Sequence, residues 1–72
     1  MTPFLQSLYE MKNEAIEHQK SCRRKMKRLD EERDGDEIIN LIIQAERAEA
    51  VAGAMSKLIA FLEENEGKED ND

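Results

Sequence analysis

The chain has 72 residues, with 17 acidic and 11 basic side chains, a formal net charge of −6, one cysteine and one histidine. A chain this short forms one small domain whose core alone gives limited stability. The single cysteine excludes an internal disulfide and favours a reducing compartment, and the acidic charge disfavours general nucleic-acid binding. Since no secretory signal and no uninterrupted apolar span is recognisable, we expect a cytoplasmic protein that does not enter the membrane.

The first predicted element is a long helix from about residue 3 to about residue 32. Thr2 and Pro3 form a typical helix start, with threonine as the N-cap and proline at the first helical position. Apolar residues then recur every three or four positions, which predicts one narrow buried stripe. The stripe runs through Phe4, Leu8, Met11, Ala15, His18 or Gln19, Cys22, Met26 and Leu29.

A dense basic segment lies in the second half of this predicted helix. Residues 20–28 carry a charge of +6 and no acid, whereas residues 29–37 carry −5. One interpretation is a solvated face that pairs with acids such as Glu46 and Glu49 and complements the helix dipole. The other is an anion site for a nucleotide or phosphate, with Tyr9 as the ring available for stacking. The candidate ligand-binding residues are Tyr9, Lys20, Arg23, Arg24, Lys27 and Arg28.

Two single residues on the stripe have chemistry of their own. His18 is predicted to be a packing residue or, near a two-fold axis, one half of a pH-sensitive pair. Cys22 is predicted to be a small core residue, and a thiol activated by Arg23 and Arg24 is the alternative. The sequence holds no CxxC pair and no Gly-rich phosphate loop, and with one histidine and one cysteine we expect no Ser-His-Asp set. We therefore predict neither enzyme activity nor a cofactor.

Residues 33–35 are predicted to form the turn between two helices. Gly35 is expected to end the first helix in the left-handed conformation. Asp34 or Asp36 is expected to cap the second helix, and Asp34 with Glu37 fits a capping box.

Two acidic patterns in the sequence are similar to parts of known metal sites. Residues 30–35 resemble the first half of an EF-hand calcium loop, but the twelfth position is Leu41 instead of the bidentate glutamate that calcium needs. Residues 14–17 and 46–49 share the E-x-x-E spacing of all-α nucleotide pyrophosphohydrolases, yet a hairpin would place them about three turns apart. A solvated acidic turn is favoured, and no metal is predicted.

The second predicted helix, from about residue 36 to about residue 65, is the most apolar part of the chain. Of the 25 residues in 38–62, 17 are apolar. A helix that is apolar around most of its circumference needs cover on several sides, more than one partner helix provides. Residues 67–72 are predicted to be a disordered acidic tail. An unbroken heptad seam contains Ile38, Leu41, Ala45, Ala48, Ala52, Met55, Ile59 and Leu62.

The short link predicts an all-α antiparallel hairpin over residues 1–66, in which residue i lies opposite about residue 69 − i. The surplus apolar surface predicts self-association, as a homodimer that forms a four-helix bundle or as a larger helical oligomer. The predicted oligomer interface consists of Ile39, Ile42, Ala45, Val51, Ala52, Leu58 and Phe61.

This architecture favours a small non-enzymatic interaction protein that acts as an adaptor, regulator or inhibitor of a partner protein. It is also typical of accessory proteins, including virus-encoded inhibitors of host systems. Its charged surfaces would orient docking more than they supply affinity. The alternatives are an oligomer that binds a small anionic ligand such as a nucleotide through residues 20–28, and a structural part of a larger assembly.

Overall fold

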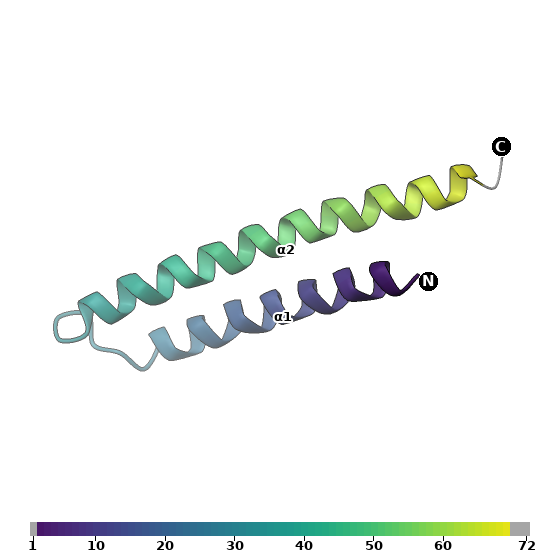
Figure 1. The fold of residues 1–72 in the computed structure, drawn as a ribbon. Coiled ribbons are helices and arrows are strands. Elements are labelled where there is room, and N and C mark those ends of the chain that lie inside the picture. Colours follow the sequence, from purple (N-terminus) through teal and green to yellow (C-terminus); the bar gives the residue numbers. More distant parts are fainter. Residues whose placement is uncertain (1, 70–72) are drawn as a thin grey trace.

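The computed structural model describes residues 2–69, and the side chains of residues 2–65, as two helices joined by a turn. Helix α1 spans Pro3–Met26 and helix α2 spans Gly35–Glu69. They run antiparallel, so that α1 begins at the end of the hairpin where α2 finishes (Figure 1). The molecule is a rod of 61 × 15 × 13 Å. The predicted all-α hairpin is confirmed.

The start of α1 agrees with the sequence. Thr2 has an extended backbone, with φ −74° and ψ 155°, and its Oγ1 accepts a hydrogen bond from the Leu5 N–H at 3.1 Å. This bond satisfies one of the N–H groups that a helix start leaves without a partner. Pro3 occupies the first turn, where its missing N–H costs nothing.

Helix α1 ends at Met26, earlier than the predicted end near residue 32. The N–H groups of Arg28 and Leu29 bond to carbonyls three residues back, at 3.1 and 3.2 Å, which tightens the chain out of the α-helix. Asp30 then folds a local turn, since its Oδ1 accepts the Glu32 N–H at 3.1 Å. Leu29 nevertheless packs against the core. Its spacing from Met26 therefore indicated a buried residue correctly, although the helix does not continue to it.

Asp34 ties the turn to the start of α2. Its carbonyl accepts the Ile38 N–H at 2.9 Å, which begins the helix, while its Oδ2 accepts the Asp30 N–H at 3.1 Å. The carboxylate therefore bonds back into the turn, and the predicted capping box with Glu37 is absent. Gly35 is the first residue of α2, and no glycine in the described part of the chain has a positive φ. Its predicted left-handed role is wrong.

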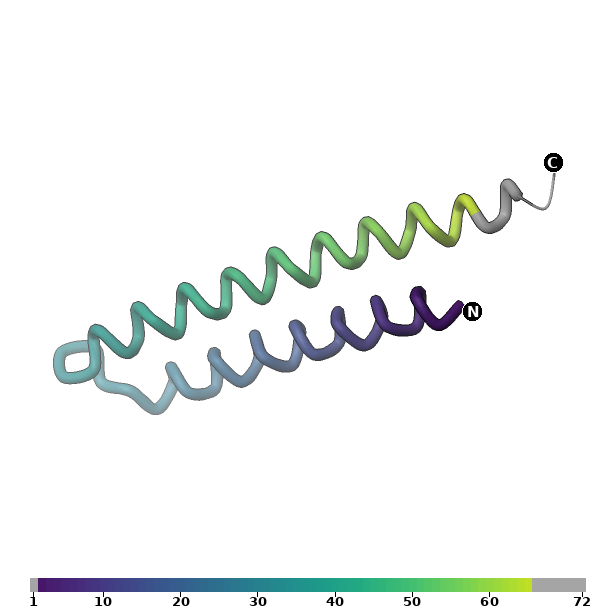
Figure 2. The backbone as a smooth tube through the Cα atoms, viewed as in Figure 1, coloured from purple at the N-terminus to yellow at the C-terminus, as the bar shows by residue number. Residues whose placement is uncertain are grey.

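The seam of α2 faces α1 as predicted. All eight heptad residues are buried or half-buried, and the two helices lie side by side along α1 (Figure 2). The core has two parts. Leu5, Leu8 and Ile59 form a cluster near the start of α1, and Cys22, Leu41 and Ala45 form a cluster near the turn.

The buried seam of α1 lies one residue further along than predicted at two places, and of the predicted pair His18 or Gln19 it contains Gln19. Leu5 is 3% exposed, whereas its neighbour Phe4 is 60% exposed, and Met11 and His18 are exposed as well. The seam instead includes polar residues whose long stems cover apolar surface while their polar ends reach water. Its members are Leu5, Leu8, Lys12, Ala15, Gln19, Cys22 and Met26.

The end of α2 also differs from the prediction. The helix continues past Gly67 to Glu69, although the sequence indicated an end near residue 65. Residues 70–72 of the predicted tail lie outside the described residues.

Candidate interaction surfaces

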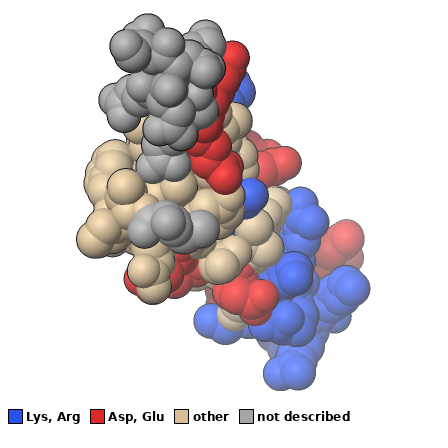
Figure 3. Space-filling model, turned by 90° about the vertical axis from the view of Figure 1, so that its right-hand side faces the viewer, with Lys and Arg blue, Asp and Glu red and all other residues tan. Residues whose placement is uncertain are grey.

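Large apolar side chains are exposed along one side of the hairpin, over the half that contains the start of α1. His18 shares a groove with Val51 and Arg23 shares a cleft with Glu46, as the predicted 69 − i register requires. By the same register, Met11 and Leu58 lie at the same level. Viewed from this end, the molecule has a largely uncharged surface on one side, while Lys and Arg gather at the lower right (Figure 3). We give the name apolar face to the large exposed apolar side chains of this half of the hairpin, which are Phe4, Met11, Val51, Leu58 and Phe61.

The positions of these residues relative to the buried seam place them on a common side. Phe4 and Met11 each precede a seam residue of α1, and Val51 and Leu58 each precede a seam residue of α2. In an antiparallel pair, these two flanks lie next to each other. The groove described next supports this, because His18 and Val51 both line it.

A shallow groove of about 300 Å³ extends the apolar face towards the turn. Its surface is mostly apolar. Because it opens beside Val51, it is continuous with the exposed side chains. The lining residues are Ala15, His18, Gln44, Arg47, Ala48 and Val51.

A second apolar surface lies on α2 near the turn. Ile39, Ile42 and Ile43 are exposed at spacings of three and four, so they form one patch, which we call the isoleucine cluster. Ile42 lines a cleft with Arg23 and Met26 on the other flank of the hairpin. The isoleucine cluster is therefore separate from the apolar face.

The structure divides the predicted oligomer interface into two groups. Its large side chains are exposed, but Ala45 is buried and Ala52 half-buried in the seam against α1. The two alanines thus serve contact within the hairpin. Sequence reasoning missed Phe4 and Met11 as surface residues, because it assigned them to the hairpin stripe. The exposed members of the predicted set are Ile39, Ile42, Val51, Leu58 and Phe61.

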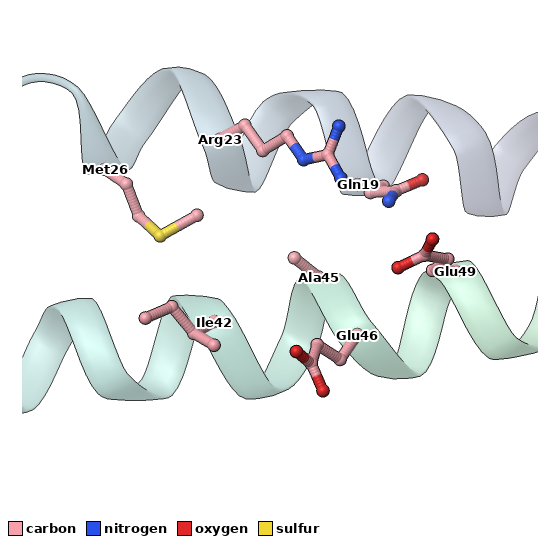
Figure 4. Close-up of a pocket in the computed structure, with 7 residues that line it drawn as sticks. All are labelled: Gln19, Arg23, Met26, Ile42, Ala45, Glu46 and Glu49. Atoms are coloured by element: carbon pink, nitrogen blue, oxygen red, sulfur yellow. The ribbon is translucent and has the colours of Figure 1, made fainter.

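The basic candidate residues are all exposed, and one of them lines a cleft between the helices. In that cleft the Arg23 side chain extends along α1 towards Gln19, and Glu49 rises from α2 opposite (Figure 4). Glu46 lies in the same cleft, as the predicted register requires. The exposed candidates are Lys20, Arg23, Arg24, Lys27 and Arg28.

Ion pairing within the basic segment is weak. Lys20 Nζ lies 3.7 Å from Glu17 Oε1, and both side chains are more than half exposed. Such surface pairs contribute ~0–1 kcal/mol. The basic segment therefore remains available to an external anion or an acidic protein surface.

Tyr9 is not brought to the basic segment within one chain. Its hydroxyl donates a hydrogen bond to Glu63 Oε1 at 3.0 Å. Because Glu63 accepts this bond and is itself negative, it raises the pKa of Tyr9, to which partial desolvation also contributes. Lys20 lies about 16 Å further along the same helix. The two parts of the predicted nucleotide site thus lie apart in the hairpin.

Cys22 is a core residue, as predicted. It is 2% exposed, and its Sγ lies 3.8 Å from His18 Nε2 and 4.0 Å from Gln44 Oε1. The thiol is therefore not open to solvent beside the neighbouring arginines. His18 itself is exposed at the edge of the groove.

Within the described residues, no three His, Cys, Asp or Glu side chains are grouped closely enough to hold a metal ion. Neither helix, over the same residues, has the length and apolar character needed to cross a membrane. Comparison with protein-family models, curated proteins and solved structures gives no match to this chain. The class is thus given by the fold alone: an all-α helical hairpin.

Proposed function

We propose that the protein is a non-enzymatic helical interaction protein that acts as a homodimer, in which two hairpins form a four-helix bundle, and that it binds a partner protein. The observation that carries this proposal is the apolar face. Large contiguous apolar patches on small soluble proteins commonly mark protein interfaces. Because this one includes side chains from both helices, it suits the face-to-face pairing of two hairpins.

The area of the apolar face is sufficient for a dimer. With about 150–250 Å² for a large aromatic side chain and somewhat less for the others, the exposed fractions of its five members amount to roughly 450 Å² per chain. Burying that area contributes on the order of 11 kcal/mol per chain before ordering costs. Association costs ~4–15 kcal/mol per dimer in lost freedom of motion. We therefore expect a dimer at micromolar concentration.

The turn end supplies candidate contacts for the partner protein. There the exposed isoleucine cluster and the basic segment offer apolar area and positive charge. Opposite charges on two proteins speed and orient their docking, while buried apolar anchors supply most of the affinity. A role as adaptor, regulator or inhibitor fits this combination.

Sedimentation equilibrium of matched variants tests the dimer. Leu58 and Lys57 are neighbours on α2, but only Leu58 belongs to the apolar face. We expect the unchanged chain and Lys57→Glu to have twice the 8.3 kDa chain mass. Leu58→Glu should be monomeric, because it would bury an unpaired charge at the interface. An unchanged chain that stays monomeric at micromolar concentration would refute the proposal.

A second candidate function is binding of a small anionic ligand such as a nucleotide. It is favoured by the exposure of all five basic candidates and by their weak internal pairing. Calorimetric titration with adenosine triphosphate and with inorganic pyrophosphate tests it, with an Arg24→Ala/Lys27→Ala variant as control. Binding that disappears in this variant would support an anion site. If neither compound gives heat with the unchanged chain, an anion site is excluded.

A further inference from the structure

The apolar face covers only one half of its side of the hairpin. From the start of α1 towards the turn, the rod carries Phe4, then Phe61 about one helical turn further along, then Met11 with Leu58, and then the groove beside Val51. Further towards the turn, the same flank carries charge. Its charged residues there are Lys25 and Arg47, both exposed, and Arg47 lines the groove together with the uncharged Gln44.

We propose that the second copy docks antiparallel and staggered on the apolar face. The two-fold axis passes near Met11 and Leu58, the halves containing the starts of α1 overlap, and the two turn ends project in opposite directions. This proposal rests on the homodimer proposed above and specifies its geometry.

Charge favours this arrangement over a parallel one. In a parallel dimer, each level of one hairpin meets the same level of its partner, so that Lys25 and Arg47 would lie against their own copies. Like charges that face each other across an interface repel and disfavour that arrangement. In the staggered antiparallel arrangement, Lys25 of each copy extends past the partner, and Arg47 lies at the edge of the overlap, beside the groove. The five residues of the apolar face lie within the overlap, with Glu14 exposed beside them.

Shape favours it as well. With the axis near Met11, Phe4 of one copy reaches the level of His18 and Val51 of the other, where the groove of about 300 Å³ opens. An aromatic side chain that fills an apolar pocket is the usual anchor of an interface. The Phe4 residue is 60% exposed in the hairpin, so most of its surface is open to a partner.

The stagger also retains the full apolar contact. All five members of the apolar face lie within the overlapping halves, which gives roughly 900 Å² of apolar area per dimer from their exposed fractions. Together with the groove and flanking polar atoms, this approaches the total of about 1,200–2,000 Å² that stable interfaces bury. The isoleucine cluster and the basic segment stay uncovered at each projecting end.

Distances between spin labels on the two copies test the arrangement. Glu32 lies exposed in the turn, away from every surface proposed to be buried. From Leu58 at the axis to Asp36 beside the turn, α2 rises about 33 Å at 1.5 Å per residue. A Glu32→Cys label in a Cys22→Ala chain should therefore give a distance of about 66 Å between the two copies of the staggered antiparallel dimer. A parallel dimer would give less than about 30 Å, and a fully overlapped antiparallel dimer about 45 Å by the same rise.

Each result has a defined meaning when the mass is measured on the same sample. A dimer mass with the long distance supports the proposal. A dimer mass with either shorter distance overturns the arrangement and leaves the homodimer standing. If the labelled chain and the chain that keeps Cys22 both have a monomer mass, the staggered arrangement and the homodimer are both overturned. Disulfide trapping gives a second measurement, since a mixture of Phe4→Cys and Val51→Cys chains should cross-link more efficiently than Val51→Cys alone.

Discussion

Replacing Leu41 or Ile43 with alanine tests the face that α2 turns towards α1. These two aliphatic residues are two positions apart near the turn, and neither belongs to the apolar face. Leu41 is 7% exposed and packs in the cluster with Cys22 and Ala45, whereas Ile43 is 44% exposed. The heptad pattern already places Leu41 in the seam and Ile43 outside it, and the structure predicts very different costs for the two substitutions.

Leu41→Ala removes three buried carbon atoms at about 0.8 kcal/mol each and leaves a partial cavity, so we expect a loss of about 3 kcal/mol. At ~4–8 °C per kcal/mol for a domain of this size, the melting temperature should fall by about 12–24 °C. Ile43→Ala should lose under ~1 kcal/mol, because about half of the side chain is already in water and alanine is the better helix former.

The assay is thermal and urea unfolding followed by far-ultraviolet circular dichroism, at one fixed protein concentration for all variants. The fixed concentration matters because any self-association makes the midpoint depend on it. If Ile43→Ala destabilised the chain as much as Leu41→Ala, the rotation of α2 about its axis would differ from the structure, and the reasoning would fail.

Three further predictions use the same unfolding measurements or a titration. Gly53 is exposed within α2 and a Cβ there would meet nothing within 4 Å, so Gly53→Ala should stabilise the chain by about 0.5–1 kcal/mol; destabilisation would indicate that another chain packs closely on that glycine. Thr2→Ala should cost about 1 kcal/mol through loss of the N-cap, whereas Thr2→Ser should keep most of it; equal losses would contradict the capping role. Glu63 raises the pKa of Tyr9 above its ordinary value in the folded chain. The contribution of this Tyr9–Glu63 interaction to folding stability should therefore be complete below about pH 10, and it should disappear as the pH rises through the raised pKa. Ultraviolet absorbance of the tyrosinate should show this, and Glu63→Gln should return the pKa towards its ordinary value; an unchanged titration in that variant would exclude Glu63 as the cause.

The sequence was sufficient to predict the contacts of α2 but not those of α1. In α2, the heptad positions are occupied by apolar residues only, so the pattern and the buried seam coincide. In α1, Lys12 and Gln19 occupy seam positions. A hydropathy pattern counts them as polar and turns the predicted stripe towards Phe4 and Met11, although their long aliphatic stems pack well at the edge of a two-helix contact.

The end of α1 was beyond the pattern for a different reason. Met26 and Leu29 have helical spacing and both reach the core, so periodicity extended the helix through them. What ends the helix is the local hydrogen bonding of Asp30 and Asp34, whose carboxylates accept backbone N–H groups in the turn. Such side chain to backbone bonds compete with the helix, and spacing alone does not show which of the two prevails.

The burial of Cys22 means that the rate of thiol labelling reports how often the hairpin opens near the turn. With Cys22 only 2% exposed between the helices, a thiol reagent can attack only after the turn-proximal half of α1 separates from α2. Labelling then proceeds at the rate of that fluctuation, or at its equilibrium population multiplied by the intrinsic rate when closing is fast. One native side chain thus reports local opening near the turn without any substitution, and a ligand or partner that clamps this end would slow the reaction.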